Sequence, residues 1–132
     1  MMNSTSPSVK SVQHESLLWI DAATLPGVRY RIRRVSLARR IDLARRLREI
    51  GRKIEFLEAS GTPAEHIEAT VLKGDIERCY LEWGLDQIQG LEIDGEAATP
   101  ELLIERGPLD LAQEVLGRVK AECGLSEAER KN

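Results

Sequence analysis

Apolar and basic residues alternate strictly between positions 28 and 33, which is typical of a strand with one buried face. The apolar members are Val28, Tyr30 and Ile32, and the basic members are Arg29, Arg31 and Arg33. The compact apolar segment Leu17–Ile20 comes before it, and Pro26-Gly27 marks a turn between the two. We therefore expect residues 17–20 to pair antiparallel with a strand near residues 28–34.

A helical period follows Ser36, whose hydroxyl can cap the first turn of a helix. Apolar residues recur at spacings of three and four over about 23 residues, and Ser60-Gly61 is a typical helix end. The pattern predicts one long helix whose buried stripe is Leu37, Ile41, Ala44, Leu47, Ile50, Ile54 and Leu57. Leu43 and Phe56 lie beside this stripe and widen it.

Basic residues of the same helix fall away from this apolar stripe. Arg39, Arg46 and Lys53 repeat every seven residues on the opposite side, and Arg45 and Arg52 lie next to them. The helix is therefore predicted to carry an exposed cationic ridge.

A second helix is predicted from Thr62 to about Glu82. Thr62 is a capping residue, Pro63 suits the first helical position, and Glu65 completes a capping box. Its expected apolar face is Ile67, Val71, Ile76, Tyr80 and Trp83. Two long helices joined by a few residues should form an antiparallel hairpin.

The pattern of apolar and polar residues changes after Trp83-Gly84. One or two short strands are expected near residues 85–93, ending in the turn dipeptide Asp94-Gly95, and they could join the earlier strand in a small sheet. Shorter helices are expected over residues 101–106 and 109–123. The inward residues of the second are predicted to be Leu111, Val115, Leu116 and Val119, and Ser126 with Glu129 makes a last capping box.

These elements predict a mainly α protein, an α+β fold with a minor sheet. At 132 residues the chain is the size of one domain. We expect residues 1–15, which are rich in serine and lack apolar periodicity, to be a disordered arm, and residues 16–132 to form a single, mainly helical domain.

Charge is strongly polarised along the chain. Residues 28–53 contain eleven basic and two acidic residues, a local balance of +9 in a chain of net charge −3. Such a basic segment favours acidic partners, and nucleic acid is one of the alternatives. The overall pI of about 5.5 and the lack of aromatic residues on the basic face favour instead a solvated or ion-pairing face, matched to the protein's own acidic half or to an acidic partner.

No pattern in the sequence indicates catalysis. Glycine-rich phosphate loops are absent, and Cys79 and His66 are thirteen residues apart, about 20 Å along one helix. Cys79 and Cys123 are expected to be buried free thiols rather than a disulfide or metal site. We therefore expect no enzyme activity, catalytic residue, metal or cofactor. The apolar run Leu17–Ile20 is far too short to span a membrane, so a cytoplasmic location is expected.

The candidate partner-binding residues are those that combine charge or aromatic surface with expected exposure. They are Arg29, Arg31, Arg33, Arg39, Arg46, Lys53, Trp19 and Trp83. For both tryptophans the alternative is a place in the core, because large aromatic side chains serve equally as core residues and as binding hot spots.

Several segments of the second half resemble a known family. They are Leu81-Glu82-Trp83-Gly84-Leu85, Gly90-Leu91-Glu92-Ile93-Asp94-Gly95, Thr99-Pro100-Glu101-Leu102-Leu103 and Gly124-Leu125-Ser126-Glu127 with Arg130-Lys131-Asn132. Together with Arg39-Arg40-Ile41 they resemble the tail assembly chaperones of tailed phages and prophages. The resemblance covers most of residues 28–132 and concerns structural rather than catalytic positions.

The resemblance implies a non-enzymatic, mainly helical interaction protein of the bacterial host cytoplasm. Such chaperones coat the long tape measure protein during tail assembly and help to bring tail tube subunits to it. Self-association is a further expectation. The alternative function is a nucleic-acid-binding or structural phage protein that uses the arginine-rich face.

Overall fold

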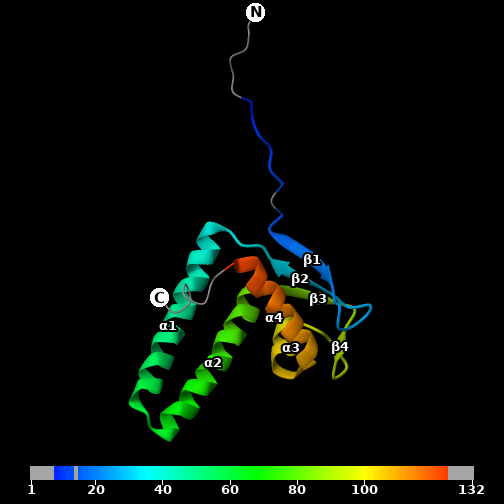
Figure 1. Cartoon of the computed structure of the whole chain (residues 1–132). Coiled ribbons are helices and arrows are strands. Elements are labelled where there is room, and N and C mark those ends of the chain that lie inside the picture. The colour runs from blue at the N-terminus through cyan, green and yellow to red at the C-terminus, as the bar shows by residue number, and fades with distance from the viewer. Residues whose placement is uncertain (1–7, 14, 125–132) are drawn as a thin grey trace, which may run out of the picture.

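The computed structural model describes residues 8–13 and 15–124 and has the predicted mainly α fold with a minor sheet. Three strands form an antiparallel sheet in the order β1-β2-β3: β1 (Leu17–Asp21), β2 (Arg29–Arg33) and β3 (Leu85–Gln89). The predicted pairing of the first two strands is confirmed, with Trp19 opposite Arg31. Figure 1 shows this sheet at one end of the molecule and a helical hairpin at the other.

The hairpin consists of α1 (Leu37–Ser60) and α2 (Pro63–Gly84), which confirms the predicted pair of long helices. The predicted caps Ser36 and Thr62 are confirmed. The return bond from Glu65 that a capping box requires is not shown, and among the described residues Glu65 Oε2 is buried without a hydrogen-bond partner. The backbone N–H of Arg39 donates to the Ser36 hydroxyl over 3.3 Å, and that of Glu65 donates to the Thr62 hydroxyl over 3.3 Å. These bonds satisfy amides that the first turn of a helix leaves open.

The rest of the described chain consists of β4 (Glu92–Ile93), β5 (Glu96–Ala97), α3 (Pro100–Arg106) and α4 (Leu109–Cys123). Of the three strands that follow α2, only β3 joins the main sheet, whereas β4 pairs with β5 as a separate hairpin. The reason is Gly90, where φ is +82° and a Cβ would lie 2.4 Å from the carbonyl oxygen of Gly27. A glycine there turns the chain away from β2.

Both predicted terminal features fall partly or wholly outside the described residues. Residues 8–13 and 15 of the expected arm are exposed and belong to no helix or strand, and they lead away from the fold in Figure 1. Residues 1–7 and 14 lie outside the described residues, as does the predicted capping box of Ser126 and Glu129.

The core lies between one face of the sheet and the helices. Tyr30 and Ile32 of β2 and Leu85 of β3 are almost inaccessible to solvent. The four inward residues predicted for α4, namely Leu111, Val115, Leu116 and Val119, are buried in the same cluster. Alternation along β2 therefore places its apolar side chains in the core and its arginines on the outer face of the sheet.

The apolar stripe predicted for α1 is partly wrong. Leu43, Leu47 and Ile54 are the buried residues of this helix, although Leu43 was expected only at the edge of the stripe. Leu37 is 75% exposed and Ile41 is 46% exposed, in contrast to the prediction that both face the core.

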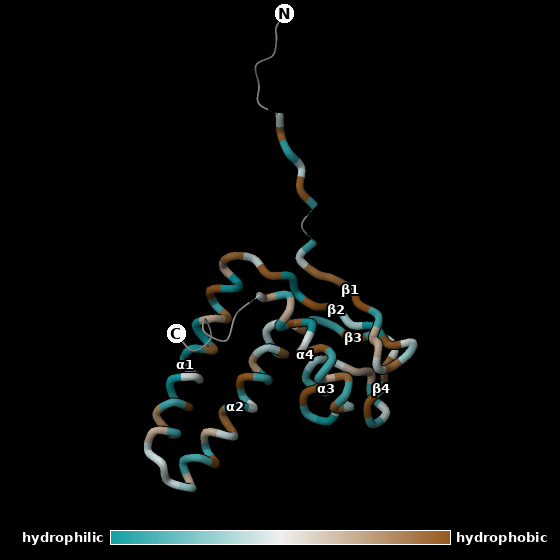
Figure 2. The backbone as a smooth tube through the Cα atoms, in the orientation of Figure 1, coloured by the Kyte–Doolittle hydropathy of each residue, from teal (hydrophilic) through white to brown (hydrophobic). Residues whose placement is uncertain are grey.

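Three further apolar side chains of the hairpin are exposed. Phe56 of α1 is 76% exposed, and Ile67 and Val71 of α2 are 68% and 56% exposed. The small Ala69 is buried instead. Figure 2 shows hydrophobic positions along the whole hairpin, including the end that extends away from the sheet. There α1 and α2 cover only each other, so each helix buries a narrow stripe and its remaining apolar residues face outward.

The end of α2 depends on close packing at Gly84. A Cβ at this position would lie 2.4 Å from Cγ1 of Val119 in α4, well inside van der Waals contact. The chain passes directly from helix to strand here, because β3 begins at Leu85, whose backbone N–H donates to the carbonyl of Leu81. Helix α2 therefore runs two residues beyond its predicted end near Glu82.

A carboxylate joins the β1–β2 turn to α4. Glu114 accepts hydrogen bonds from the backbone N–H of Thr24 (2.8 Å) and of Ala23 (3.0 Å), and from the Tyr30 hydroxyl (2.8 Å). Burial alone would raise the pKa of Glu114, but these donors outweigh it and the pKa is lowered. Burial, followed by the hydrogen bond to Glu114, raises the pKa of Tyr30.

We predict that Gly84→Ala destabilises the fold by roughly 1–3 kcal/mol, because the added methyl group overpacks the contact with Val119. The matched control is Gly74→Ala in the same helix, where a Cβ would meet nothing within 4 Å. This control should leave stability unchanged or raise it by up to about 1 kcal/mol. Urea denaturation measures both, and equal effects at the two positions would contradict the packing described for Gly84.

We predict that Glu114→Gln lowers the free energy of unfolding by roughly 1–2 kcal/mol at neutral pH, because charge-assisted hydrogen bonds are weakened. Since the folded pKa of Glu114 lies below its ordinary value of 4.5, its ionised form stabilises the fold above that pH. The difference between the two proteins should shrink as pH falls through the lowered pKa. Denaturation curves between pH 3 and 7 would show this, and a difference independent of pH would contradict it.

Candidate functional site

The outer face of the sheet carries the first group of predicted site residues. The guanidinium of Arg29 lies 4.5 Å from the centre of the Trp19 ring, and that of Arg31 lies 5.1 Å from it. Cation–π contacts of this kind hold two like charges near one aromatic ring. Trp19 is half-buried, and it contacts its own chain's arginines rather than standing free.

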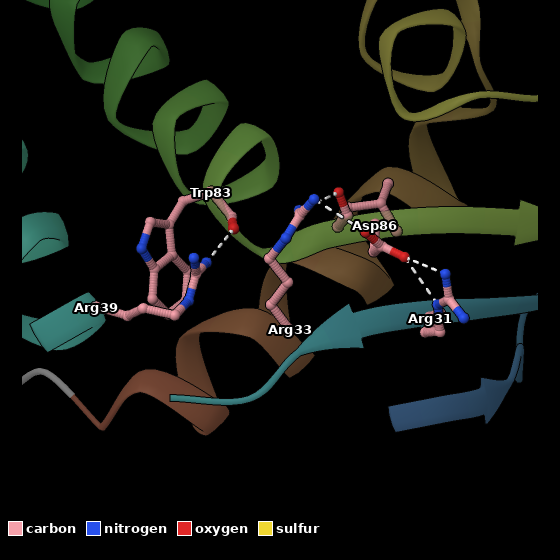
Figure 3. A network of polar contacts seen from close by, with 6 residues as sticks. Arg31, Arg33, Arg39, Trp83 and Asp86 are labelled. Carbon is pink, nitrogen blue, oxygen red and sulfur yellow. Dashed lines mark hydrogen bonds and ion pairs between the residues drawn. The ribbon is translucent and has the colours of Figure 1, made fainter. Parts of the chain in front are cut away.

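Asp86 neutralises the next two arginines. Its carboxylate contacts Arg31 at 2.6 Å and Arg33 at 2.9 Å, and Arg33 also donates to the carbonyl of Leu85 over 3.2 Å. Figure 3 shows Asp86 reaching from β3 between these two guanidinium groups. Sequence reasoning missed Asp86, because the contact depends on how β3 pairs with β2 and on the irregular register between Arg31 and Ile32.

Arg39 and Trp83 contact each other across the hairpin. The guanidinium of Arg39 lies 4.6 Å from the centre of the indole ring and donates to the backbone carbonyl of Trp83 over 2.9 Å, as Figure 3 shows. Trp83 is only 5% exposed, so the expectation that it is displayed to a partner is wrong and the core alternative holds. Burial lowers the pKa of Arg39, and the nearby charge of Arg33 adds to this effect.

The prediction that Arg39, Arg46 and Lys53 lie opposite the buried stripe is wrong. This row lies on the flank of the stripe, beside α2. Arg39 contacts Trp83, and the charge of Arg46 is close enough to lower the pKa of Cys79, although burial raises that pKa overall. Arg46 also pairs with Asp42 at 3.1 Å, and Lys53 lines a shallow hollow together with Leu72 of α2. The row sits here because α1 rotates to bury Leu43, which moves the stripe toward these cations.

Two more arginines attach α1 and the segment before it to the end of α4. Arg34 lies 3.5 Å from Glu122, and Glu122 also accepts from the backbone N–H of Val35 over 3.1 Å. Arg40 donates to the carbonyl of Cys123 over 3.2 Å, at the negative end of the α4 dipole. Much of the basic segment therefore stabilises the fold.

A different set of residues is free on α1. Among the described residues, Arg45, Arg48 and Arg52 make no ion pair and no hydrogen bond from their side chains. They share one side of the helix with three exposed apolar residues, because all six recur at spacings of three and four. We call this surface the α1 outer face; it comprises Leu37, Ile41, Arg45, Arg48, Arg52 and Phe56.

The α1 outer face is long, convex and both apolar and basic. Leu37 and Phe56 are nineteen positions apart, which is about 28 Å of helix. Exposed leucine, isoleucine and phenylalanine side chains are typical of protein–protein contact surfaces. Here Leu37 and Ile41 lie at one end of the face and Phe56 lies at the other. Unpaired arginines beside them would favour a partner that carries carboxylates.

Histidine, cysteine and acidic side chains are the usual metal ligands and reactive groups of proteins. Within residues 8–13 and 15–124, no group of three or more histidine, cysteine or acidic side chains is placed to hold a metal ion. Cys79 and Cys123 are free thiols, and burial raises the pKa of Cys79, which makes it a poorer nucleophile. His66 is exposed near the start of α2, far from Cys79 near its end.

Comparison with known proteins gives no match: no family profile, no curated protein and no solved structure is similar to this chain. None of the helices in the described residues is both long and apolar enough to cross a membrane.

We predict that the arginines divide into two classes according to how much their substitution by alanine destabilises the fold. Arg33→Ala and Arg39→Ala should each destabilise the fold by roughly 1–2 kcal/mol, because each removes hydrogen bonds to Asp86 or to a backbone carbonyl. Arg45→Ala and Arg52→Ala should change stability by less than about 0.5 kcal/mol. Urea denaturation tests this, and a large loss for Arg45→Ala would show that the α1 outer face is not free.

Proposed function

We propose that this chain is a non-enzymatic interaction protein of phage or prophage tail assembly, a tail assembly chaperone that works in the host cytoplasm. Its α1 outer face binds an exposed helical segment of the tape measure protein. The observation that carries the proposal is the row of exposed side chains on α1, in which three unpaired arginines lie between Leu37 and Ile41 at one end and Phe56 at the other. A chaperone needs such a surface, because its client exposes apolar helices that would otherwise aggregate.

The geometry of α1 suits a helical client. A partner helix laid along α1 would cover Leu37, Ile41 and Phe56 with its own apolar stripe, as in other helix pairs. Carboxylates on the flank of the client helix would lie near Arg45 and Arg52. Apolar contact then supplies most of the affinity, and charge supplies orientation and speed of encounter.

The resemblance to tail assembly chaperones rests on residues with clear structural roles. Gly84 allows α4 to approach α2, Gly90 turns the chain after β3, and Asp94-Gly95 forms the β4–β5 turn with positive φ at both residues. These positions have structural roles in this chain, and the proposed role itself is taken from the resemblance. Recruitment of tail tube subunits and self-association belong to the same proposal.

The alternative is a nucleic-acid-binding phage protein that uses the outer face of the sheet. Trp19 and the exposed Arg29 favour it, since aromatic and guanidinium groups can stack on unpaired bases. Against it, Asp86 neutralises Arg31 and Arg33 on the same face. Protein binding through α1 is therefore the better-supported function.

We predict that co-expression with a tape measure fragment keeps that fragment soluble and that Ile41→Ser with Phe56→Ser abolishes this effect, because the apolar contact is lost. Arg45→Glu with Arg52→Glu should weaken binding roughly tenfold or more. The readout is the soluble fraction of the fragment and its co-purification with the chain.

The matched control is Ile67→Ser with Val71→Ser, which removes as much exposed apolar surface from α2 and should leave solubilisation intact. Equal loss in both double variants would contradict the assignment to α1. Salt-sensitive binding to duplex DNA that Arg29→Ala removes, together with no effect on the fragment, would favour the alternative function.

A further inference from the structure

A second apolar surface lies on the other side of the hairpin, in a groove between α2, α3 and α4. Its volume is about 320 Å³, and its apolar lining includes Val71 and Leu81 of α2, Ile104 of α3, and Leu109 and Leu116 of α4. Val71 is 56% exposed and Leu109 is 69% exposed. Ile67 lies one turn before Val71 and extends the apolar surface along α2.

The charge of this groove is opposite to that of the α1 outer face. Asp75 and Glu77 line it, and among the described residues neither has a basic partner. Arg78 also lines it, but this arginine contacts both Glu82 (3.0 Å) and Glu105. The arginine is more than balanced by these two carboxylates, so the surroundings of the groove are net acidic.

Gly74 lies in the lining of the groove, in the middle of α2. A glycine inside a helix costs up to about 1 kcal/mol relative to alanine. Packing within the chain does not require it, because a Cβ at this position would meet nothing within 4 Å. Gly84 in the same helix is different, since Val119 leaves no room for a side chain there. The bare backbone at Gly74 allows another helix to come close.

We infer that the α2–α4 groove is a docking site for an amphipathic helix of a second protein, one whose apolar stripe is flanked by lysine or arginine. The choice of a basic partner follows from the unpaired carboxylates of Asp75 and Glu77. Its apolar residues lie on Val71, Leu81 and Leu109, and its backbone passes over Gly74. This site takes a partner of the opposite charge from the one that fits the α1 outer face, so the chain can hold two different proteins at once.

The test uses two synthetic amphipathic peptides, one of leucine and lysine and one of leucine and glutamate, with the full chain. The leucine–lysine peptide should bind, and Gly74→Leu should weaken its binding at least about tenfold by filling the groove. The same variant should raise the melting temperature, because leucine favours helix more than glycine does. Lost binding in a more stable protein separates a docking role from a structural one.

Matched variants assign the effect to the groove. Asp75→Lys with Glu77→Lys should shift the preference toward the leucine–glutamate peptide, while Ile41→Ser with Phe56→Ser on the α1 outer face should leave leucine–lysine binding unchanged. No binding, or binding that Gly74→Leu leaves intact, would overturn the inference. Sedimentation showing a dimer that Gly74→Leu dissociates would overturn it too, because the groove would then hold a second copy.

The inference stands apart from the proposed function. A chain that binds the leucine–lysine peptide in the groove but fails to solubilise a tape measure fragment would uphold the docking site and defeat the chaperone assignment. A chain that solubilises the tape measure fragment but does not bind the leucine–lysine peptide would uphold the chaperone assignment and defeat the docking site.

Discussion

Close packing at the junction of α2 and β3 is the constraint on which the rest of the structure depends. Gly84 has no side chain, so Val119 of α4 packs directly against the backbone where the helix ends. The strand starts at the next residue, Leu85, and pairs with β2. No flexible linker separates the hairpin from the sheet, and Trp83, one residue earlier, supplies the ring on which Arg39 rests. The short segment of residues 83–85 therefore fixes the orientation of the hairpin relative to the sheet.

Local signals in the sequence were sufficient for the order of the main elements and for the starts of α1 and α2. Ser36 and Thr62 cap helices through hydrogen bonds to residues three positions away, so neighbouring residues alone determine these boundaries. Alternation along β2 likewise identified its buried and exposed faces. Neighbouring residues alone did not determine the rotation of α1 about its axis, because the apolar stripe of the helix is wider than the surface that α2 covers. Tertiary packing chose Leu43 and left Leu37 outside.

The candidate site was predicted at the level of charge but not of individual residues. An excess of arginine was evident from the sequence, yet the partner of an arginine is a long-range property. Asp86 is 55 residues from Arg31, and the carbonyl of Trp83 is 44 residues from Arg39. Because of these contacts, Arg31 and Arg39 stabilise the fold instead of standing free for a partner. Within residues 28–53, all of which the structure describes, the arginines without an ion pair or hydrogen bond that also lie on the α1 outer face are Arg45, Arg48 and Arg52. The sequence pattern places Arg45 and Arg52 beside the ridge and does not single out Arg48.

The hairpin exposes apolar surface on two sides, and surface of this kind carries a risk of unspecific association. Charge limits that risk differently on each side. Three unpaired arginines repel a second α1 outer face, and the carboxylates of Asp75 and Glu77 repel a second groove, so contacts between like surfaces of two copies are disfavoured. A helix with acidic flanks is attracted to one side and repelled from the other, and a basic helix experiences the reverse. Apolar contact can then provide affinity on both sides while the sign of the charge decides which partner binds where.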